Sequence, residues 1–198
     1  KADLMTKADL EEVAQIKVGY QAKTRIKEEA RGTHRLIQSK DFDSCHRLRS
    51  DNLTVFFPER KPEIYSVRKG DILFQARGVA HFAYCIEDDL KDTLAAGSFY
   101  ILRTRNEELL PQYLAWWLNQ SKAQAYFQSR ARGAGMSFIS KSTLSRLPIP
   151  IPPLSVQGKV VKVVTLAKHE QFLLDRLSEL RSRLINTVCI KAIQAQER

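Results

Sequence analysis

Basic side chains recur at alternate positions in residues 19–27, which read GYQAKTRIK. If this stretch is a β-strand, Lys23, Arg25 and Lys27 all project from one face, because successive side chains of a strand alternate. Phosphates along one DNA strand recur at a comparable spacing, so this face and the neighbouring Tyr20 are predicted to contact DNA. The pattern fits equally well an exposed edge strand that its charges protect from further pairing.

A second group of candidate DNA-binding residues lies in glycine-containing turns. Arg77 precedes Gly78 at the end of an apolar run, and residues 130–141 read RARGAGMSFISK. Glycine lets the backbone approach a ligand closely. We therefore expect DNA contacts from Arg77 and from Arg130, Arg132, Gly133, Gly135, Ser137 and Lys141. A nucleotide-binding phosphate loop is the competing interpretation, but the Gly-Lys-Ser/Thr ending of such loops is absent.

Residues suited to catalysis are sparse. Asp71, Asp89 and Lys91 loosely resemble the carboxylate and lysine set of metal-dependent nucleases. The acidic run 87–92 is better interpreted as a solvated turn. The sequence contains neither an Asn/Asp-Pro-Pro-aromatic tetrad nor a glycine-rich loop suited to a methyl donor. We therefore predict no catalytic residue, no cofactor and no enzymatic activity of the chain by itself.

Metal ligation is not indicated either. His81 and Cys85 lie four residues apart, and Cys45 adjoins His46, but neither pair completes a ligand set. Three cysteines far apart in sequence suit reduced thiols in a cytoplasm better than a disulfide framework.

The charge balance points to a polyanionic partner. The 198 residues include 32 Lys and Arg against 22 Asp and Glu, which gives a net charge of +10. Such an excess favours nucleic acid first and an acidic membrane surface second. No run approaches the roughly 18 apolar residues that a membrane span requires. We therefore expect a cytoplasmic protein that binds double-stranded DNA and no membrane.

The chain before residue 147 has the pattern of a mixed α/β domain. Residues 4–18 predict a short amphipathic helix or turn, and residues 109–130 predict a helix with Pro111 in its first turn. The face of Tyr113, Leu114, Trp117, Leu118 and Ala125 is expected to be buried. Strands are predicted at 53–57, 72–75, 82–86 and 97–103, and a short turn or helix at 140–147.

A proline-rich segment divides the chain. Residues 147–154 read LPIPIPPL, and four prolines in six positions exclude a helix or a central strand. An edge strand or an extended arm remains, with Leu147, Ile149 and Ile151 on one face. After this segment the sequence has no proline. We therefore predict a DNA-binding domain at 1–152 and a long helix at 153–198.

The predicted helix has an apolar stripe. Leucines recur at intervals of seven, four and three residues, while charged residues fill the other faces. A helix of about 40 residues is roughly 60 Å long, and an exposed leucine stripe needs a partner helix. The interface of a homodimer is therefore predicted at Leu166, Leu173, Leu177, Leu180, Leu184 and Val188.

Four segments together resemble the specificity subunit of type I restriction–modification systems. They are Gly70-Asp-Ile-Leu with Ala-Arg-Gly78, Leu110-Pro-Gln-Tyr-Leu-Ala-Trp-Trp-Leu, the loop 133–139, and Leu147-Pro-Ile-Pro-Ile-Pro-Pro-Leu-Ser-Val-Gln157. The Pro-Pro-Leu-x-x-Gln block before a leucine-striped helix is the most specific part. The chain has Val156 where the family usually carries Glu.

The resemblance implies a non-catalytic α/β target-recognition domain that reads a few base pairs in the major groove. It also implies a coiled-coil helix that docks methyltransferase subunits, with the restriction subunit reached indirectly. Family members typically hold two such domains and two helices, whereas this sequence has one of each. It is therefore similar to half-length specificity subunits, which homodimerise to read a divided, palindromic site. The alternative is a coiled-coil interaction module that binds DNA without sequence preference.

Overall fold

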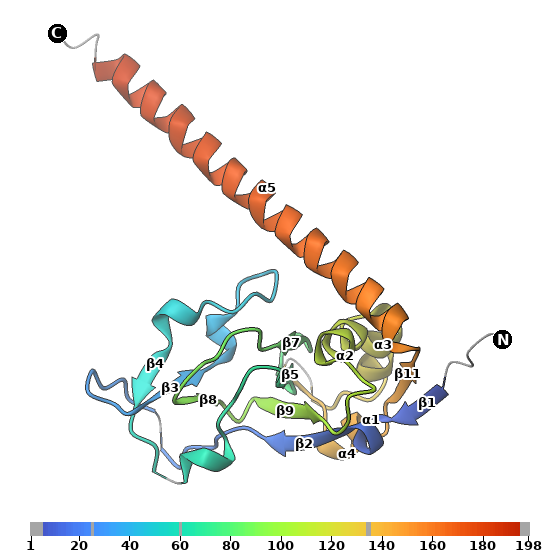
Figure 1. Cartoon of the computed structure of the whole chain (residues 1–198). Coiled ribbons are helices and arrows are strands. Elements are labelled where there is room, and N and C mark those ends of the chain that lie inside the picture. Colours follow the sequence, from blue (N-terminus) through green and yellow to red (C-terminus); the bar gives the residue numbers. More distant parts are fainter. Residues whose placement is uncertain (1–5, 25, 60, 134–135, 195–198) are drawn as a thin grey trace. The chain divides into compact units, whose positions relative to one another are not determined.

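The computed structural model describes residues 6–24, 26–59, 61–133 and 136–194 (Figure 1). The chain divides into two compact units, residues 1–158 and 159–198. The first unit is a mixed α/β domain, and the second consists of the greater part of one long helix. The predicted fold class, a mixed α/β domain followed by a long C-terminal helix, is confirmed.

Among the described residues, the first unit has a four-stranded sheet, a three-stranded sheet and two two-stranded pairs. The four-stranded sheet, the larger sheet, is antiparallel with strand order β2 (Ala14–Val18), β9 (Phe99–Thr104), β5 (Ile72–Gln75) and β7 (Ala83–Cys85). The three-stranded sheet, the smaller sheet, has strand order β4 (Thr54–Phe56), β3 (His34–Ile37) and β8 (Thr93–Ala95), with β3 and β8 parallel. The predicted strands at 53–57, 72–75, 82–86 and 97–103 are therefore present within one or two residues at each end.

The principal core combines side chains from both sheets. Leu73 and Ile101 from the larger sheet cluster with Ile37 and Ala95 from the smaller one. Their neighbours Leu36 and Leu94 join a second cluster, because alternate residues of a strand face opposite sides. On the other face of the larger sheet, the ring of Phe74 lies 4.8 Å from that of Phe127 in a covering helix. All four residues of β5 are consequently buried, and its sequence is apolar except for Gln75.

The helix predicted at 109–130 is wrong as a single element. The structure has α2 (Pro111–Leu118) and α3 (Ser121–Gln128), which lie near β5 and β7 (Figure 1). Three side-chain amides end α2 by donating to its last carbonyl groups: Asn119 to Ala115, Gln120 to Trp116 and Gln124 to Leu118. Ala123 and Phe127 are buried in α3, whereas Ala125 is exposed and Trp117 is only half-buried.

Asn119 also completes the edge of the larger sheet. Its amide accepts from the N–H of Ala83 at 2.9 Å and donates to the carbonyl of Ala83 at 2.8 Å. The side chain thus takes the place of a neighbouring strand beside β7. Edge strands need such cover because their backbone groups otherwise remain free to pair with other chains.

The N-terminal prediction is also corrected. The described part of the stretch 4–18, residues 6–18, is mostly strand, with β1 (Thr6–Asp9) and β2 on either side of a short α1 (Leu10–Val13). The backbone of β1 pairs with β11 (Pro148–Ile151), which is the proline-rich segment in its predicted edge-strand form. Ile149 of β11 is fully buried. Short α4 (Lys141–Ser145) precedes β11 and begins with Ser140, whose Oγ accepts from the N–H of Thr143.

The long helix α5 runs from Leu154 to Gln194. Its first turn belongs to the first unit, where the amide of Gln157 is fully buried. The Gln157 amide accepts from the N–H of Leu110 at 2.9 Å and donates to the carbonyls of Glu108 and Pro152, both at 2.8 Å. The glutamine of the Pro-Pro-Leu-x-x-Gln block therefore joins the start of α5 to the segment before α2 and to the proline-rich segment.

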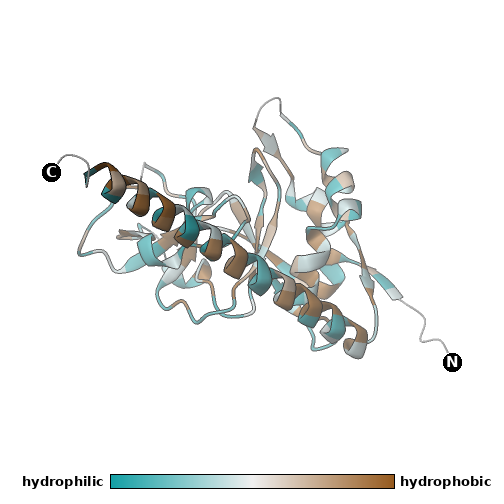
Figure 2. Ribbon diagram, turned by 90° about the horizontal axis from the view of Figure 1, so that it is seen from above, coloured by the Kyte–Doolittle hydropathy of each residue, from teal (hydrophilic) through white to brown (hydrophobic). Residues whose placement is uncertain are grey.

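Taken by itself, the rest of α5 presents apolar side chains along its length, as Figure 2 shows in brown. The six residues of the predicted stripe are between 48% and 64% exposed: Leu166, Leu173, Leu177, Leu180, Leu184 and Val188. None of the described helices is long and apolar enough to cross a bilayer.

Candidate nucleic-acid interface

Arg77 lies where β5 ends and the chain turns toward β7. The short strand β6 (Arg77–Gly78) begins there, held by hydrogen bonds from the N–H groups of Ala76 and Arg77 to the carbonyl of Ser98. The guanidinium carbon of Arg77 lies 4.8 Å above the ring centre of Phe138. This cation–π contact limits the orientations of an exposed side chain, and no carboxylate of the described residues forms an ion pair with it.

The loop predicted to border the DNA lies beside Arg77. Strand β10 (Ser137–Phe138) pairs with β6, so that Phe138 lies opposite Arg77 and Ser137 lies opposite Gly78. On its other side Phe138 exchanges two backbone hydrogen bonds with Arg132. We call β6 and β10 together the β6–β10 ribbon. Four predicted contact residues, Arg77, Arg132, Gly133 and Ser137, therefore come from two distant segments into one place.

Glycine is required at one of these positions. Gly133 has φ +105°, and a Cβ there would lie 2.7 Å from the carbonyl oxygen of Met136. The steric requirement therefore explains the first glycine of the loop. Gly135, the second predicted contact glycine, lies outside the described residues.

A hydrogen-bond chain joins the two halves of the ribbon. The Oγ of Ser137 lies 3.0 Å from the carbonyl oxygen of Gly78 and 2.8 Å from Nε2 of His81. The Nδ1 of His81 lies 2.9 Å from the carbonyl oxygen of Gln75. His81 therefore connects Gln75, at the end of β5, to Ser137 in the loop 130–138. Among the described residues there is no group of three side chains that could hold a metal ion.

Arg130 and Lys141 lie at the ends of α3 and α4. The guanidinium carbon of Arg130 is 4.0 Å from the ring centre of Tyr126, whose hydroxyl donates to the carbonyl of Thr143. Both cations are exposed. Burial raises the pKa of Tyr100, and the charge of Arg77 acts on that pKa in the opposite direction.

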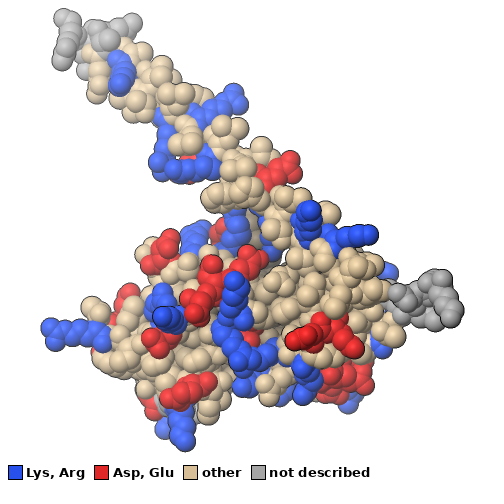
Figure 3. Space-filling model, viewed as in Figure 1, with Lys and Arg blue, Asp and Glu red and all other residues tan. Residues whose placement is uncertain are grey.

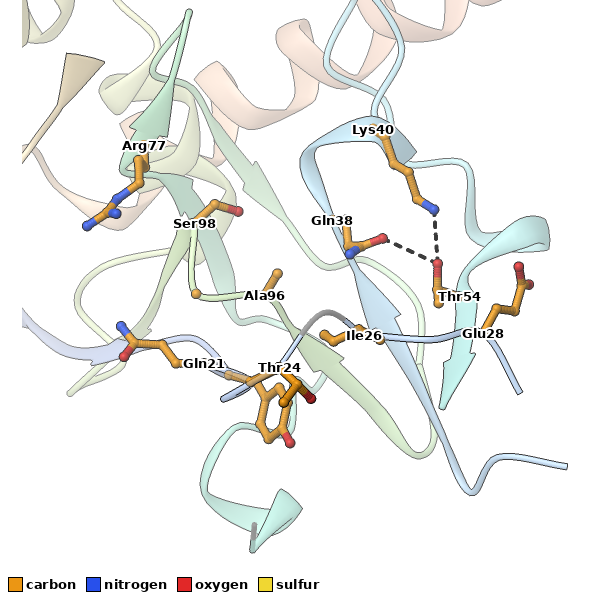
Figure 4. Close-up of a pocket in the computed structure, with 13 residues that line it drawn as sticks. Gln21, Thr24, Ile26, Glu28, Gln38, Lys40, Thr54, Arg77, Ala96 and Ser98 are labelled. Carbon is orange, nitrogen blue, oxygen red and sulfur yellow. Dashed lines mark hydrogen bonds between the residues drawn. The ribbon is translucent and has the colours of Figure 1, made fainter. Parts of the chain in front are cut away.

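A hollow of about 840 Å³ adjoins Arg77 (Figure 4). Gln38 and Lys40 converge there on Thr54, whose Oγ1 donates to Gln38 and accepts from Lys40 at 3.0 Å. Arg77 and Gln21 lie on the opposite side of the hollow in this view. Glutamine amides and arginine guanidinium groups can each form two hydrogen bonds with a base edge, Gln with adenine and Arg with guanine. The hollow therefore carries side chains suited to reading bases.

Sequence reasoning missed the polar residues of this hollow. Gln21, Gln38 and Ser98 are far apart in the chain and have no distinctive spacing. Gly97 was the available signal, because a Cβ there would lie 2.7 Å from Cγ of Gln21. A glycine beside a strand indicates close approach, although it does not identify the neighbour.

The predicted cationic strand at 19–27 is wrong. The described part of this stretch makes no strand, and Arg25 lies outside the described residues. Lys23 and Lys27 are exposed. Tyr20 is only 2% exposed, and its hydroxyl accepts from the N–H of Glu59 at 2.9 Å. Its ring packs against Phe56 and Tyr65, which gives Tyr20 a structural role, and its DNA contact stays a prediction.

The acidic residues considered for nuclease chemistry are explained structurally. Asp71 is 1% exposed and forms a two-point ion pair with Arg103, at 2.7 Å to Nε and 2.6 Å to Nη2. The hydrogen bonds that Arg103 donates to the Asp71 carboxylate raise the pKa of Arg103. Asp89 and Lys91 are exposed in the connection before β8. The ion pair between Asp71 and Arg103 joins the turn before β5 to β9, so we interpret it as a structural contact.

Basic and acidic side chains both lie on the surface of the first unit. On the face drawn in Figure 3, basic and acidic side chains are interspersed without a continuous basic patch. The net charge of +10 therefore does not by itself locate a DNA-binding face. The β6–β10 ribbon and the hollow are the candidates for such a face on grounds of geometry.

Comparisons with known proteins agree on one family. Residues 3–171 match the family model described as type I restriction modification DNA specificity domain. No curated protein matches the sequence. Three solved chains have a similar structure. The S subunit of a type I restriction-modification system from M. genitalium has a TM-score of 0.57 at 14% identity, covering 84% of this chain and 39% of that one.

The HsdS subunit from Thermoanaerobacter tengcongensis has a TM-score of 0.59 at 21% identity, covering 88% and 41% of the two chains. A chain solved to explain complex assembly and conformational transition of the type I R-M system gives 0.58 at 21% identity, covering 88% and 42%. At these identities the similarity shows a shared fold. The chain spans about two fifths of the length of the solved chains that it matches.

Proposed function

Because the chain belongs to the family of type I restriction modification DNA specificity domains, we propose that it supplies sequence-specific DNA recognition to such a complex. This family is the non-catalytic, DNA-recognising component of the system, so the chain is not itself the enzyme. In our proposal residues 1–152 read one half of a divided site, and residues 153–198 hold the assembly together. The methyltransferase subunits act on the DNA, and the restriction subunit joins through them.

The observation that carries the proposal is the meeting of Arg77 with the 130–138 loop. Two arginines, Arg77 and Arg132, flank the Phe138 strand of the β6–β10 ribbon. Beside them lies the hollow with Gln21, Gln38 and Lys40. Sequence-specific readers combine phosphate contacts, which position the protein, with base-edge contacts, which specify the sequence. This face offers side chains for both.

The helix supports the proposal of a two-headed assembly. Its exposed stripe of leucines suits a second helix of the same kind, and two copies would provide two recognition domains related by symmetry. Such a pair would read a palindromic site in two parts. Outside the stripe, Leu174 and Ile185 share another face of the helix and are 53% and 52% exposed, so this face could contact methyltransferase subunits in our proposal.

Selection from a random pool of DNA duplexes tests the proposal. The full chain, assembled with its methyltransferase subunits, is incubated with the pool and excess competitor DNA, and the bound duplexes are sequenced. Enrichment of one two-part sequence is the expected result. Equal binding of all duplexes, with a steep dependence on salt concentration, would support a module that binds DNA without sequence preference.

A further inference from the structure

Two apolar side chains are exposed beside the arginines of the proposed DNA-binding face. Val79 is 92% exposed and Met136 is 66% exposed. Both line a second hollow of about 490 Å³, to which Arg77 and Gly78 also contribute. Single exposed apolar residues are common on protein surfaces, so exposure alone carries no argument. What distinguishes these two residues is their position at the tip of the β6–β10 ribbon, just beyond Gly78 and just before Ser137.

The register of the ribbon relates these side chains to the arginines. Arg77 pairs with Phe138 and Gly78 pairs with Ser137, in antiparallel orientation. The next position outward on each side is Val79 and Met136. Both residues lie just beyond the paired strands, and together with Arg77 they line the same hollow. This hollow therefore has a cationic part at Arg77 and an apolar part at Val79 and Met136.

The ribbon is held in place before any ligand binds. Hydrogen bonds of Ser137 and His81 join the loop 130–138 to residues 75–78, and the Phe138 ring contacts the Arg77 guanidinium. Val79 and Met136 are attached at the ends of these fixed segments. Side chains positioned in this way lose less conformational freedom on binding, which favours a specific contact.

The chemistry of the tip suits one feature of duplex DNA. A two-stranded β-ribbon fits the major groove, and the apolar group presented there is the C5-methyl of thymine. Cations on the same face would meet phosphates or a guanine edge. We infer that Val79 and Met136 read thymine by contacting its methyl group, next to a base pair or phosphate bound by Arg77. This inference rests on the proposed DNA-recognition function.

Replacing thymine by deoxyuridine tests the inference, because it removes the methyl group and leaves the hydrogen-bonding groups of the base unchanged. The selected target is synthesised with each thymine replaced in turn, and binding to the assembled complex is measured. At one or more positions the complex should bind about fourfold more weakly, which corresponds to losing one buried methyl-sized group.

The combined variant Val79→Ala and Met136→Ala makes the test specific. It should bind the unmodified target more weakly than the wild type and show no further loss with deoxyuridine at the sensitive position. Ile64→Ala is the matched control, since Ile64 is an exposed apolar residue that lines neither hollow beside Arg77. This control should keep the full sensitivity to deoxyuridine.

Three results would overturn the inference while leaving sequence-specific recognition intact. They are a selected target without thymine, a wild-type complex insensitive to every replacement, and a combined variant as sensitive as the wild type. If the selection enriches no sequence at all, the proposed function itself fails. The two failures are therefore distinguishable.

Discussion

Arg77 combines three properties expected of a DNA-reading arginine. Its side chain is exposed, it stacks over Phe138, and its backbone is fixed to Ser98. Arginine forms two parallel hydrogen bonds with a guanine edge or a phosphate. The structure thus presents a positioned guanidinium group on the surface.

We predict that Arg77→Ala weakens binding of the assembled complex to its target by about 1–3 kcal/mol, the range for one good base contact. Lys69→Ala is the control, because Lys69 is an exposed cation at the opposite end of β5. It should change the affinity much less. Titration of a labelled duplex at constant salt measures both, and equal losses would contradict a specific role of Arg77.

His46 gives the folded domain a pH dependence. Its ring stacks on Phe82 with centroids 4.1 Å apart, and burial lowers the pKa of His46, partly opposed by the charge of Asp43. The fold therefore favours the neutral ring. The stabilisation is fully present above the ordinary pKa of 6.5 and is lost as the pH falls through the lower folded-state value.

We predict that His46→Phe, which keeps a ring on Phe82, reduces the loss of stability between pH 7.5 and the acid side of 6.5. The free energy of unfolding by urea, measured at several pH values, provides the comparison. The other histidines are present in both proteins and cancel. An identical pH dependence of the two proteins would contradict the assignment to His46.

Among the elements, the start of α5 depends most on a single side chain. Replacing Gln157 by Ala leaves the N–H of Leu110 and the carbonyls of Glu108 and Pro152 without this partner. We predict that the domain loses about 1–3 kcal/mol of stability, as for a buried polar group left unsatisfied. Gln171→Ala removes one exposed hydrogen bond in the same helix and should change stability by less than about 0.5 kcal/mol. Denaturant unfolding measures both, and equal effects would contradict this role.

Sequence patterns predicted those elements in which the order of apolar and polar residues follows the burial of the side chains. Ile72, Leu73 and Phe74 of the strand 72–75 are buried on both faces of the sheet, which explains their apolar run. The proline-rich segment was predicted as an edge strand or an extended arm, because proline excludes a helix and a central strand, and it forms the edge strand β11. The helix at 109–130 was overestimated, since its apolar pattern continues through a break made by the amides of Asn119, Gln120 and Gln124.

The assembly of the site depends on pairing between distant segments, which single-sequence patterns do not encode. Arg77 and Arg132 were predicted from glycine neighbours, but their common attachment to Phe138 follows from the β6–β10 register. Alternating cations at 19–27 suggested a strand, yet the fold uses this stretch as an irregular connection around the buried Tyr20. Local propensity was overridden there by packing of the aromatic cluster.

At the scale of the whole molecule, the exposed stripe of α5 accounts for the proposed pairing of two copies. We predict that the wild-type chain is a dimer in solution. The combined Leu173→Glu and Leu180→Glu variant should be a monomer, because pairing of the two helices would bury its glutamate charges away from water, which costs free energy. Gln171→Glu and Ser182→Glu together add the same charge on the opposite side of the helix and should preserve the dimer. Sedimentation equilibrium gives the masses. A monomeric wild type, or dissociation by both variants, would contradict pairing through the stripe.

The map of methylated positions in DNA from cells that express the assembled complex tests the central claim most directly. The account predicts methylation within one palindromic sequence made of two separated parts. Deleting one heptad between residues 166 and 184 shortens the helix by roughly 10 Å. The gap between the parts should then shrink by about three base pairs of 3.4 Å each. Methylation of a single undivided sequence, or scattered over unrelated sequences, would contradict the account.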